Sequence, residues 1–332
     1  MMNRMIFANL VHRPVRSLIS IVAVGLEVTL ILLIVGLSLG ILNDSRERQA
    51  GVGADVIVMP PGSSFIVGLT GAPMSIKIGG ILQKLEHVRV VAPVLTQVST
   101  GGTLEMIDGI DLKSYEALRP FRFLEGGPFQ GPYDALVDDI FARSKGAKVG
   151  DKIEVLNHDF RIAGIVEQGK GARKFVPLAT MQDLLGAQGK ASVFFLKLDD
   201  PKNADAVVDE IKHVPGLGRY VPTSMAYYLS MMTTSNYPGL SSFINVVIAI
   251  SVIIGFIVIF QAMYAAVMER TREIGILKSM GASKLYIVNI VLRETVLLAL
   301  FGIIFGIIVS LAAKFGIVHR LPLLRVNITG GW

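Results

Sequence analysis

Side chains that could catalyse a reaction or hold a metal ion are few and scattered in this sequence. No two of the five histidines stand four residues apart, and none belongs to a His-Glu-x-x-His string, so each fits an ordinary surface or core histidine better than a metal ligand. The chain has no cysteine, which excludes disulfides and thiolate metal sites. We therefore expect no catalytic, metal-binding or cofactor-binding residue. The histidines are His12, His87, His158, His213 and His319.

One glycine-rich stretch is faintly similar to a phosphate-binding loop. It reads Gly186-Ala-Gln-Gly-Lys-Ala-Ser192, but it lacks the first glycine at the required distance, and Lys190 is not followed by Ser or Thr. We interpret the stretch as the turn that ends a helix. The sequence carries no Walker motif, so we expect the chain itself not to hydrolyse ATP.

The stretch 268–286 is short and charged, and a long apolar segment lies on either side of it. Ile274, Leu277 and Met280 recur every three residues among charged neighbours, which predicts a short amphipathic helix. Gly281 is expected to stop this helix, and Ser283 to cap the next one. A structured element at this place fits a docking surface for another protein. The alternative is a solvated loop at the membrane surface, where basic residues are common.

Polar and small residues inside the apolar segments are the remaining candidates. Glu27 is the only charged residue of segment 18–42, and such a carboxylate usually faces a bundle interior or a wet cavity. The alternative is that Glu27 pairs with a polar group on a neighbouring helix. Two Gly-x-x-x-Gly pairs predict close helix packing, namely Gly36 with Gly40 and Gly302 with Gly306. A sparse polar set on the second apolar segment either lines a pathway or bridges helices: Ser241, Ser242, Asn245, Ser251 and Gln261.

The elements that position these residues follow from where apolar residues cluster. Hydrophobic residues make up 52% of the chain and charged residues 17%, which is typical of membrane proteins. Segments 18–42, 240–267 and 287–313 are each long enough to cross a bilayer, which takes about 20 residues. The first is too long for the apolar core of a signal peptide, about 7–15 residues. No cleavage site precedes Asn43, so we expect a retained helix.

Lysine and arginine set the expected orientation. Three arginines and no acidic residue precede the first span, and the stretch 268–286 carries four basic residues, so segments 1–17 and 268–286 are expected in the cytoplasm. Region 43–237 and the tail 314–332 then lie outside, although the tail also carries basic residues. The net charge of +6 is therefore interpreted as a topology signal, and nucleic acid is not expected as a partner.

Region 43–237 has the patterns of a mixed α+β domain. Strands are expected at 54–59, 88–97 with an interruption at Pro93, 104–110 and 192–198, and a hairpin at 152–156 and 160–166. Helices are expected at 81–86, 112–118, 180–185 and 204–213. A turn-rich break indicates a soft subdomain boundary at 126–132. The predicted fold class is an α-helical membrane protein with a large α+β extracytoplasmic domain.

Two strings resemble a known family. Glu269-Arg-Thr-Arg-Glu-Ile-Gly-Ile-Leu-Lys-Ser-Met-Gly-Ala-Ser283, followed by a helix with Arg293-Glu294, resembles the MacB/FtsX-type permeases of ABC transporters. The hairpin strings Gly150-Asp-Lys-Ile-Glu-Val155 and Phe160-Arg-Ile-Ala-Gly-Ile165 are similar to the family's periplasmic core domain. The resemblance covers most of the chain in the same order of elements. The family also has a fourth membrane helix after an external loop, which is expected but does not occur in the sequence up to Trp332.

The resemblance implies several binding partners for this chain and no catalytic activity of its own. It implies a permease that binds two copies of a separate ABC ATPase and pairs with itself or with a homologous permease. ATP would be bound by the ATPase, so no cofactor is expected on this chain. Further expected partners are membrane lipids and a periplasmic adaptor (membrane fusion) protein. The stretch 268–286 corresponds to a coupling helix seated on the ATPase, with these contact residues: Arg270, Glu273, Ile274, Leu277, Lys278, Met280 and Gly281.

The implied function is export of a small molecule, lipid or lipoprotein from the bacterial inner (cytoplasmic) membrane. Motion would pass from the ATPase to the external domain without a conventional pore, a mode called mechanotransmission. The alternative is an FtsX-like signal-transducing protein that regulates an external cell-wall hydrolase. The length of region 43–237 is nearer to the MacB-like than to the smaller FtsX-like domain, which favours export. A stand-alone receptor would leave the helix at 273–280 without a partner.

Overall fold

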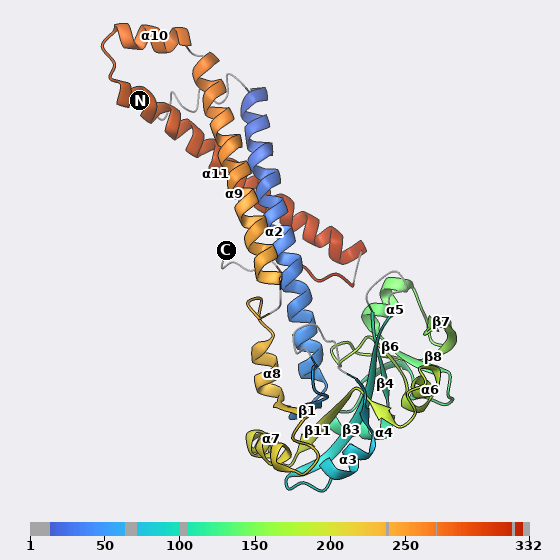
Figure 1. The fold of residues 1–332 in the computed structure, drawn as a ribbon. Coiled ribbons are helices and arrows are strands. Elements are labelled where there is room, and N and C mark those ends of the chain that lie inside the picture. Colours follow the sequence, from blue (N-terminus) through green and yellow to red (C-terminus); the bar gives the residue numbers. More distant parts are fainter. Residues whose placement is uncertain are drawn as a thin grey trace. The chain divides into compact units, whose positions relative to one another are not determined.

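The fold is described from a computed structural model, which covers residues 14–63, 72–99, 105–236, 239–269, 271–320 and 323–327 (Figure 1). The chain divides into two compact units. The membrane unit comprises residues 1–40, 239–319 and 326–332, and the sheet unit comprises residues 41–238 and 320–325. Residues 1–13 of the predicted cytoplasmic segment and Arg270 lie outside the described residues.

Within the described residues, three helices are long and apolar enough to span a membrane, as predicted. They are α2 (Pro14–Gly51), α9 (Leu240–Glu269) and α11 (Lys284–Arg320). Both α2 and α11 continue beyond the apolar segments from which they were predicted. After Asn43, α2 continues through residues 46–50, which are arginine, glutamate, glutamine and alanine. These residues are good helix formers, but a search for long apolar segments does not detect them. Lys314 and Arg320 of the predicted tail belong to α11.

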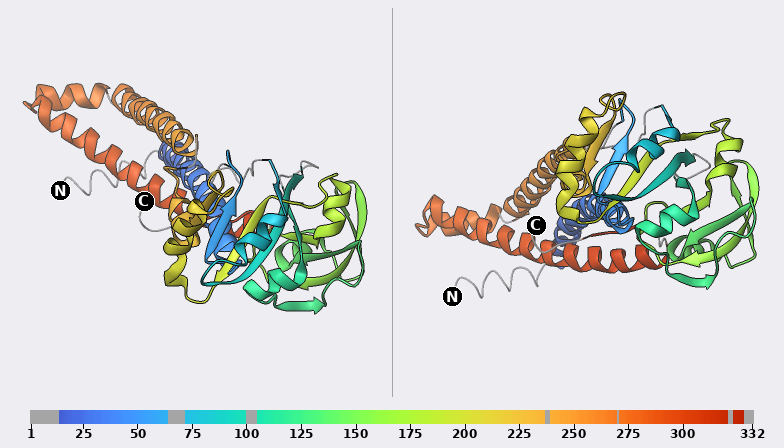
Figure 2. Two further views of the ribbon diagram at one scale, coloured as in Figure 1. Left: turned by 60° about the horizontal axis from the view of Figure 1, so that its bottom comes forward. Right: turned by 90° about the horizontal axis from the view of Figure 1, so that it is seen from below.

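The helix α10 (Thr271–Ser279) connects α9 to α11. Both views of Figure 2 show it, in orange, joining the end of α9 to the beginning of α11. The predicted short helix in the charged stretch is therefore present, and separate helices precede and follow it.

In the described part of the sheet unit, ten strands form one sheet in the order β12-β1-β11-β3-β4-β9-β6-β8-β5, with β7 paired to β8. Only β4–β9 and β6–β8 are parallel pairs. The strands are β1 (Val56–Met59), β3 (Val88–Ser99), β4 (Glu105–Ile110), β5 (Phe123–Gly126), β6 (Asp134–Asp138), β7 (Lys152–Val155), β8 (His158–Val166), β9 (Lys174–Pro177), β11 (Val193–Leu198) and β12 (Val221–Ser224). A separate pair is formed by β2 (Met74–Ser75) and β10 (Lys190–Ala191).

Both faces of this sheet are covered, which explains why β1 is apolar throughout and why β11 is apolar except for Lys197. Side chains alternate along a strand, so Ile57 and Met59 enter one core and Val56 and Val58 the other. The helices α3 and α7 cover the face that carries Val56, whereas α4 and α8 pack on the opposite face. The helices of the sheet unit are α3 (Lys77–Leu82), α4 (Leu112–Leu118), α5 (Asp139–Lys145), α6 (Leu178–Leu184), α7 (Ala204–His213) and α8 (Met225–Met231). The predicted fold class is confirmed.

The strand β3 is not interrupted at Pro93, contrary to the prediction. Pro93 pairs with Phe194 of β11, whereas the pairing of β3 with β4 begins only at Val94. Proline lacks a backbone N–H and is tolerated in a strand where one side has no partner. The helix expected at 81–86 also lies earlier, at α3, because Gly79 and Gly80 lowered the helix expectation there.

The predicted subdomain boundary at 126–132 is wrong. The strands on either side of this stretch, β5 and β6, both pair with β8 in the same sheet. The backbone N–H groups of Gln130 and Gly131 donate hydrogen bonds to the Asp134 carboxylate, at 2.7 and 2.8 Å. The turn-rich composition therefore marks a fixed connection inside one sheet.

Candidate functional site

The ends of α10 are fixed by local hydrogen bonds. Gly281 has φ of +93°, and the N–H of Ala282 donates to the carbonyl of Leu277 while that of Gly281 donates to Lys278. This is a Schellman closure, which requires a residue that accepts a left-handed backbone. The hydroxyl of Ser283 then accepts from the N–H of Tyr286 at 3.2 Å and caps α11. The predicted helix stop and helix cap are both confirmed.

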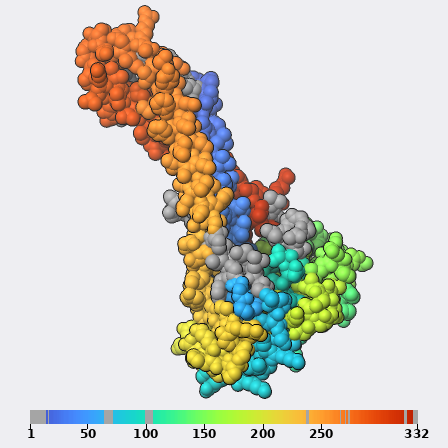
Figure 3. Space-filling view, in the orientation of Figure 1, coloured from blue at the N-terminus to red at the C-terminus, as the bar shows by residue number. Residues whose placement is uncertain are grey.

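Apolar side chains are exposed on α10 and on the first turn of α11. Ile274 and Leu277 are half-buried, whereas Met280 is 71% exposed. Sequence reasoning missed Ile276, which is 53% exposed, and Leu285, which is 81% exposed just after the turn. Lys278 is exposed, and the side chain of the predicted contact residue Glu273 lies outside the described residues. In Figure 3, α10 and the first turns of α11 form a continuous surface, so the candidate contact extends past Gly281.

Glu27 faces the neighbouring helix α9. Both carboxylate oxygens lie 2.9 Å from the position that a Cβ at Gly255 would occupy, so Gly255 leaves room for them. A cavity of about 560 Å³ lies between α2 and α9, but its lining, from Pro14 to Ala23 and from Val258 to Glu269, does not include Glu27. Glu27 therefore lies in the contact between α2 and α9, and its functional role stays a prediction.

The glycines of α11 lie against α2. A Cβ at Gly302 would come within 2.7 Å of Val24, and one at Gly306 within 2.6 Å of the carbonyl oxygen of Gly25. The Thr29 hydroxyl donates to the carbonyls of Gly25 and Gly306, at 2.7 and 3.1 Å. Sequence reasoning missed Gly25, which belongs to no Gly-x-x-x-Gly pair. Of the other predicted pair, Gly36 accepts a hydrogen bond from the N–H of Asn327 at 2.8 Å, and Gly40 is buried.

No group of three or more His, Cys, Asp or Glu side chains in the described ranges could hold a metal ion. His87 contacts Asp199 at 2.9 Å, and both side chains are exposed. The glycine-rich stretch after α6 is the predicted helix end, with Ala187 donating to the carbonyl of Gln182.

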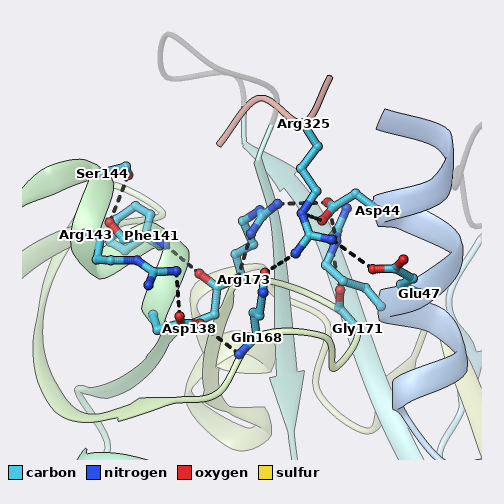
Figure 4. Close-up of polar contacts among 12 residues, drawn as sticks. Asp44, Glu47, Asp138, Phe141, Arg143, Ser144, Gln168, Gly171, Arg173 and Arg325 are labelled. Carbon is cyan, nitrogen blue, oxygen red and sulfur yellow. Dashed lines mark hydrogen bonds and ion pairs between the residues drawn. The ribbon is translucent and has the colours of Figure 1, made fainter. Parts of the chain in front are cut away.

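A buried network of charged side chains joins three segments of the sheet unit (Figure 4). Its centre is Asp44, near the end of α2, which accepts from Arg48 at 3.0 Å, from Arg173 at 2.8 Å and from Arg325 at 3.2 Å. Arg173 also donates to Asp138 at 2.8 Å. The network therefore ties the end of α2 to the sheet and to segment 323–325.

Further hydrogen bonds complete this Asp44 network. Asp138 also caps α5 by accepting from the N–H of Phe141 at 2.7 Å. Arg325 reaches Glu47 at 2.8 Å and also donates to Gln168. The Asp44 and Asp138 side chains are only 9% and 2% exposed. Burial raises the pKa of Asp138, and the positive charge of Arg173 opposes that shift. Removing one partner of such a buried group is costly, because it leaves an unpaired charge away from water.

Sequence reasoning missed the Asp44 network entirely. The spacing of Asp44 and Arg48 is a helical ion-pair spacing and was the one local signal. Arg173 is 129 residues from Asp44, and Arg325 was read as a basic residue of a tail. Pairing across such separations depends on the sheet topology, which a single sequence does not reveal.

A second buried polar group lies on β4. The Asp108 carboxylate accepts from the Thr96 hydroxyl at 2.8 Å, and burial raises the pKa of Asp108 to about 6. The Tyr115 hydroxyl is buried and has no hydrogen-bond partner among the described residues. The Lys170 ammonium lies 4.0 Å from the centre of the Phe121 ring, and burial lowers the pKa of Lys170 to about 8. The stability of the sheet unit should therefore depend on pH.

Two family models match the chain. The MacB-like periplasmic core domain matches residues 17–214, from α2 to just past α7. The FtsX-like permease C-terminal model matches residues 245–326, which contain α10 and α11. The first match alone covers more than half of the chain.

Several curated relatives are similar over nearly the whole chain. An uncharacterised ABC transporter permease of Methanocaldococcus jannaschii is 24% identical over 355 residues, covering 98% of this chain and 87% of the relative. The macrolide export ATP-binding/permease protein MacB of Campylobacter jejuni is 21% identical over 338 residues, covering 93% of this chain and 52% of the relative. The ABC transporter permease YtrF of Bacillus subtilis is 29% identical over 192 residues, covering 56% and 44%. The chain thus spans about half the length of MacB.

Two solved structures are similar to about half of this chain. The periplasmic region of MacB from Actinobacillus actinomycetemcomitans matches with a TM-score of 0.43 and 14% identity, over 55% of this chain and 94% of that one. The extracellular domain of the transporter YknZ from Gram-positive bacteria matches with a TM-score of 0.40 and 12% identity, over 51% and 98%.

Proposed function

Because the chain belongs to the MacB/FtsX-type family of ABC transporter permeases, we propose that it passes the movement of a partner ABC ATPase to its own extracytoplasmic domain. It is a membrane protein with an extracytoplasmic domain, and this movement would drive export of a small molecule, lipid or lipoprotein. ATP would be bound and hydrolysed by the ATPase. The name of the Campylobacter jejuni relative joins ATP binding to a permease, which supports this pairing.

The continuity of α2 is the observation that carries the proposal. This helix begins at Pro14, before the apolar segment 18–42, and ends at Gly51 in the sheet unit. A helix resists stretching and bending because each turn is hydrogen-bonded to the next. The last turns of α2 are held by the Asp44 network. An axial movement of α2 would therefore be passed to the sheet unit instead of being absorbed by a flexible linker.

At the other end of the pathway we place the ATPase on α10 and the first turn of α11. Exposed apolar side chains flanked by charges are the usual anchors of a helix in a protein groove, and Met280 and Leu285 supply them. The Schellman closure at Gly281 fixes the chain between the two helices, so a displacement of α10 would act directly on α11. We expect two ATPase copies and a second permease copy in the complex.

An insertion of three glycines after Asn43 tests this coupling. It interrupts α2 between the apolar segment and Asp44, at about 1 kcal/mol of lost helix propensity per glycine, and leaves the network residues in place. Spin labels on Leu124→Cys and Val246→Cys, which are exposed positions in the two units, report the movement. In the complex with the ATPase, the label distance should change between nucleotide-free and vanadate-trapped states in the parent chain but not in the insertion variant.

The same insertion after Gly62 is the matched control. Gly62 lies in an exposed turn with no atom near its Cβ position, so the distance change should persist there. ATPase activity should remain in both variants. A distance change of parental size after the insertion at Asn43 would refute transmission through α2.

A second candidate function is FtsX-like regulation of an external cell-wall hydrolase. The match of residues 245–326 to the FtsX-like permease model favours it as much as export. The two functions differ in what the sheet unit binds. Retention of a cell-wall hydrolase by the purified complex would favour regulation, and retention of an adaptor protein with substrate-stimulated ATPase activity would favour export.

We propose the cytoplasmic (inner) membrane as the location, with α10 in the cytoplasm and the sheet unit outside. Because the chain has no cysteine, single cysteines at Ser63 and Ser279 report their side of the membrane without background. They should react with an impermeant maleimide from opposite sides. Reaction from the same side would overturn this topology.

A further inference from the structure

A cleft of about 840 Å³ lies in the sheet unit at the ends of β4 and β9. These strands are parallel neighbours, and their pairing ends at Ile110 and Pro177. The helix after β4, α4, joins the core that contains Val94, whereas the helix after β9, α6, joins the core that contains Leu95. Successive side chains of a strand point to opposite faces, so the two helices leave the strand ends on opposite faces of the sheet. In open α/β sheets such a divergence leaves a crevice in which ligands bind.

The strand β3 has an open edge in this cleft. The carbonyl of Val94 accepts from the N–H of Ser192, just before β11, and the N–H of Thr96 donates to the Ser192 hydroxyl. Backbone groups alternate in direction along a strand, so those of Val91 point away from β11, to the side of β4. The pairing of β3 with β4 reaches only to Val94, opposite Ile110. In the described ranges, the N–H and carbonyl of Val91 therefore have no strand beside them, and Val91 lines the cleft.

The neighbours of Val91 on the same side of β3 fit this orientation. The carbonyl of Arg89, two residues earlier, accepts from the side-chain amide of Gln83 at 3.0 Å. A side chain thus satisfies this carbonyl at a place where β4 does not reach. Pro93, two residues later, also lines the cleft and has no N–H that would need a partner. Val91 is therefore the residue of this edge that offers a donor and an acceptor together.

The wall of the cleft is almost uncharged. Among the described residues that line it, Asp111 is the only charged one. Its carboxylate already accepts from the N–H of Ser114 at 3.0 Å and from the Ser114 hydroxyl at 2.7 Å, which caps α4. Much of the remaining wall is apolar, with these side chains: Ile76, Pro93, Ile110, Leu112, Phe129 and Leu178.

We propose that this cleft binds an extended, uncharged apolar segment of a partner protein, which adds a short strand to β3 at Val91. A peptide in the extended conformation presents an N–H and a carbonyl side by side, as an exchange of two hydrogen bonds with Val91 requires. Its alternate side chains would lie against the apolar wall. A lipid chain would leave both groups of Val91 unpaired in an apolar site, which is unfavourable. An anion would meet no cation in the wall. The site goes beyond the coupling role proposed above and does not depend on it.

The test uses the full chain without ATPase, in nanodiscs of phosphatidylcholine, with empty nanodiscs as the control for partitioning into lipid. The probe is a fluorescein-labelled peptide, Val-Thr-Val-Thr-Val with blocked ends, since about five residues is the usual length of a strand. Fluorescence anisotropy measures its binding. Two further peptides carry N-methyl groups, one on its threonines and the other on its valines.

The two methylated peptides separate strand addition from simple apolar binding. With the valine side chains against the wall, only one of the two sets of N–H groups can face Val91. We expect one methylated peptide to bind about tenfold more weakly than the other, or weaker still. Saturation with the parent peptide should also slow hydrogen exchange of the Val91 amide about tenfold or more. These measurements need no variant, so they do not depend on a variant folding.

A cleft-filling variant with a matched control locates the site. Ala179 is exposed on α6 and lines the cleft, so Ala179→Trp should weaken binding of the parent peptide about tenfold or more. Ala117→Trp, the same change at an exposed position of α4 that does not line the cleft, should leave it unchanged.

Three results would each overturn the proposal. Equal binding of the two methylated peptides would mean that the cleft takes apolar molecules without adding a strand. Absence of saturable binding would mean that the edge does not accept a strand, because backbone pairing does not depend on the peptide's sequence. An unchanged exchange rate of the Val91 amide would place the peptide elsewhere. Because no ATPase is present, failure here leaves the coupling proposal untouched.

Discussion

The surface of α10 and the first turn of α11 differs from the Asp44 network in which side chains are exposed and which are buried. On α10 and the first turn of α11, apolar residues that would normally be covered are exposed, with Leu285 at 81%. In the network, charged residues that would normally be exposed are buried and paired, with Asp138 at 2%. An exposed apolar surface calls for a partner, whereas a buried and fully paired polar cluster is complete within the chain. Changes in the network should therefore affect folding, and changes on α10 should affect assembly.

The largest effect is expected for Arg173→Met, which removes the common partner of Asp44 and Asp138. Breaking a buried pair typically costs about 3–5 kcal/mol, and here Asp138 loses the cation that compensates its buried charge, whereas Asp44 keeps Arg48 and Arg325. Urea-dependent pulse proteolysis of the full chain in detergent would measure the lost stability of the sheet unit. Arg122→Met is the matched control, since the exposed Arg122–Glu167 pair at 3.2 Å should contribute less than about 1 kcal/mol. Equal losses in both variants would contradict the role assigned to the network.

The pH dependence of stability should show the buried carboxyl on β4. The pKa of Asp108 is about 6 when folded against 3.8 unfolded, so the folded state holds its proton more tightly. The free energy of unfolding should then fall as pH rises from about 4 to 6, by up to about 3 kcal/mol. Asp108→Asn removes this contribution, so the difference between the two chains should change across that interval. A difference that stays constant from pH 4 to 7 would contradict the assignment.

Leu277→Asp should weaken assembly without unfolding the chain. A charge placed in a desolvated contact costs a few kcal/mol, or about a hundredfold or more in affinity for the ATPase. Co-purification and titration with the ATPase would measure this loss, and the urea midpoint of the sheet unit should not move. Thr271→Asp, at an exposed position on the same helix, is the control. Undiminished binding of the Leu277→Asp chain would show that α10 is only a connecting turn.

A smaller effect is expected inside the membrane unit, from Gly306→Leu. Its side chain would collide with the Gly25 carbonyl and with Val28 of α2, and such overpacking typically costs about 1–3 kcal/mol. Gly316→Leu on the same helix meets no atom within 4 Å and serves as the control. Thermal stability in detergent should fall for the first variant only. Equal stability of the two would mean that α2 and α11 do not pack through these glycines.

The features that sequence reasoning captured are local ones. The helix stop at Gly281 and the cap at Ser283 depend on neighbours within a few residues, and the membrane helices depend on a continuous apolar run. The β7–β8 hairpin was also predicted, but its turn was expected at residues 157–159 and lies at Leu156 and Asn157, with φ of 54° and 61°.

The features that it missed depend on which strands become neighbours. Pro93 was read as a strand breaker because the absence of β4 beside it could not be foreseen. The Asp44 network needs β6, β9 and segment 323–325 to meet at the end of α2. The cleft at the ends of β4 and β9 also depends on long-range contacts. Local physical rules therefore give the elements and their ends, but the long-range contacts that make the site require the fold.

The end of α2 has a mechanical consequence of its own. The N–H of Gly171 donates to the carbonyl of Arg48, and the Arg48 side chain donates to the carbonyl of Gly171. Gly51 meets the backbone of Gly169 so closely that any side chain there would overlap its carbonyl oxygen. Where two backbones touch, no rotamer change can absorb a small displacement. The contact between the end of α2 and residues 169–171 should therefore be either intact or broken, with no intermediate arrangement. The hydrogen-exchange rate of the Gly171 amide would report how often the contact opens.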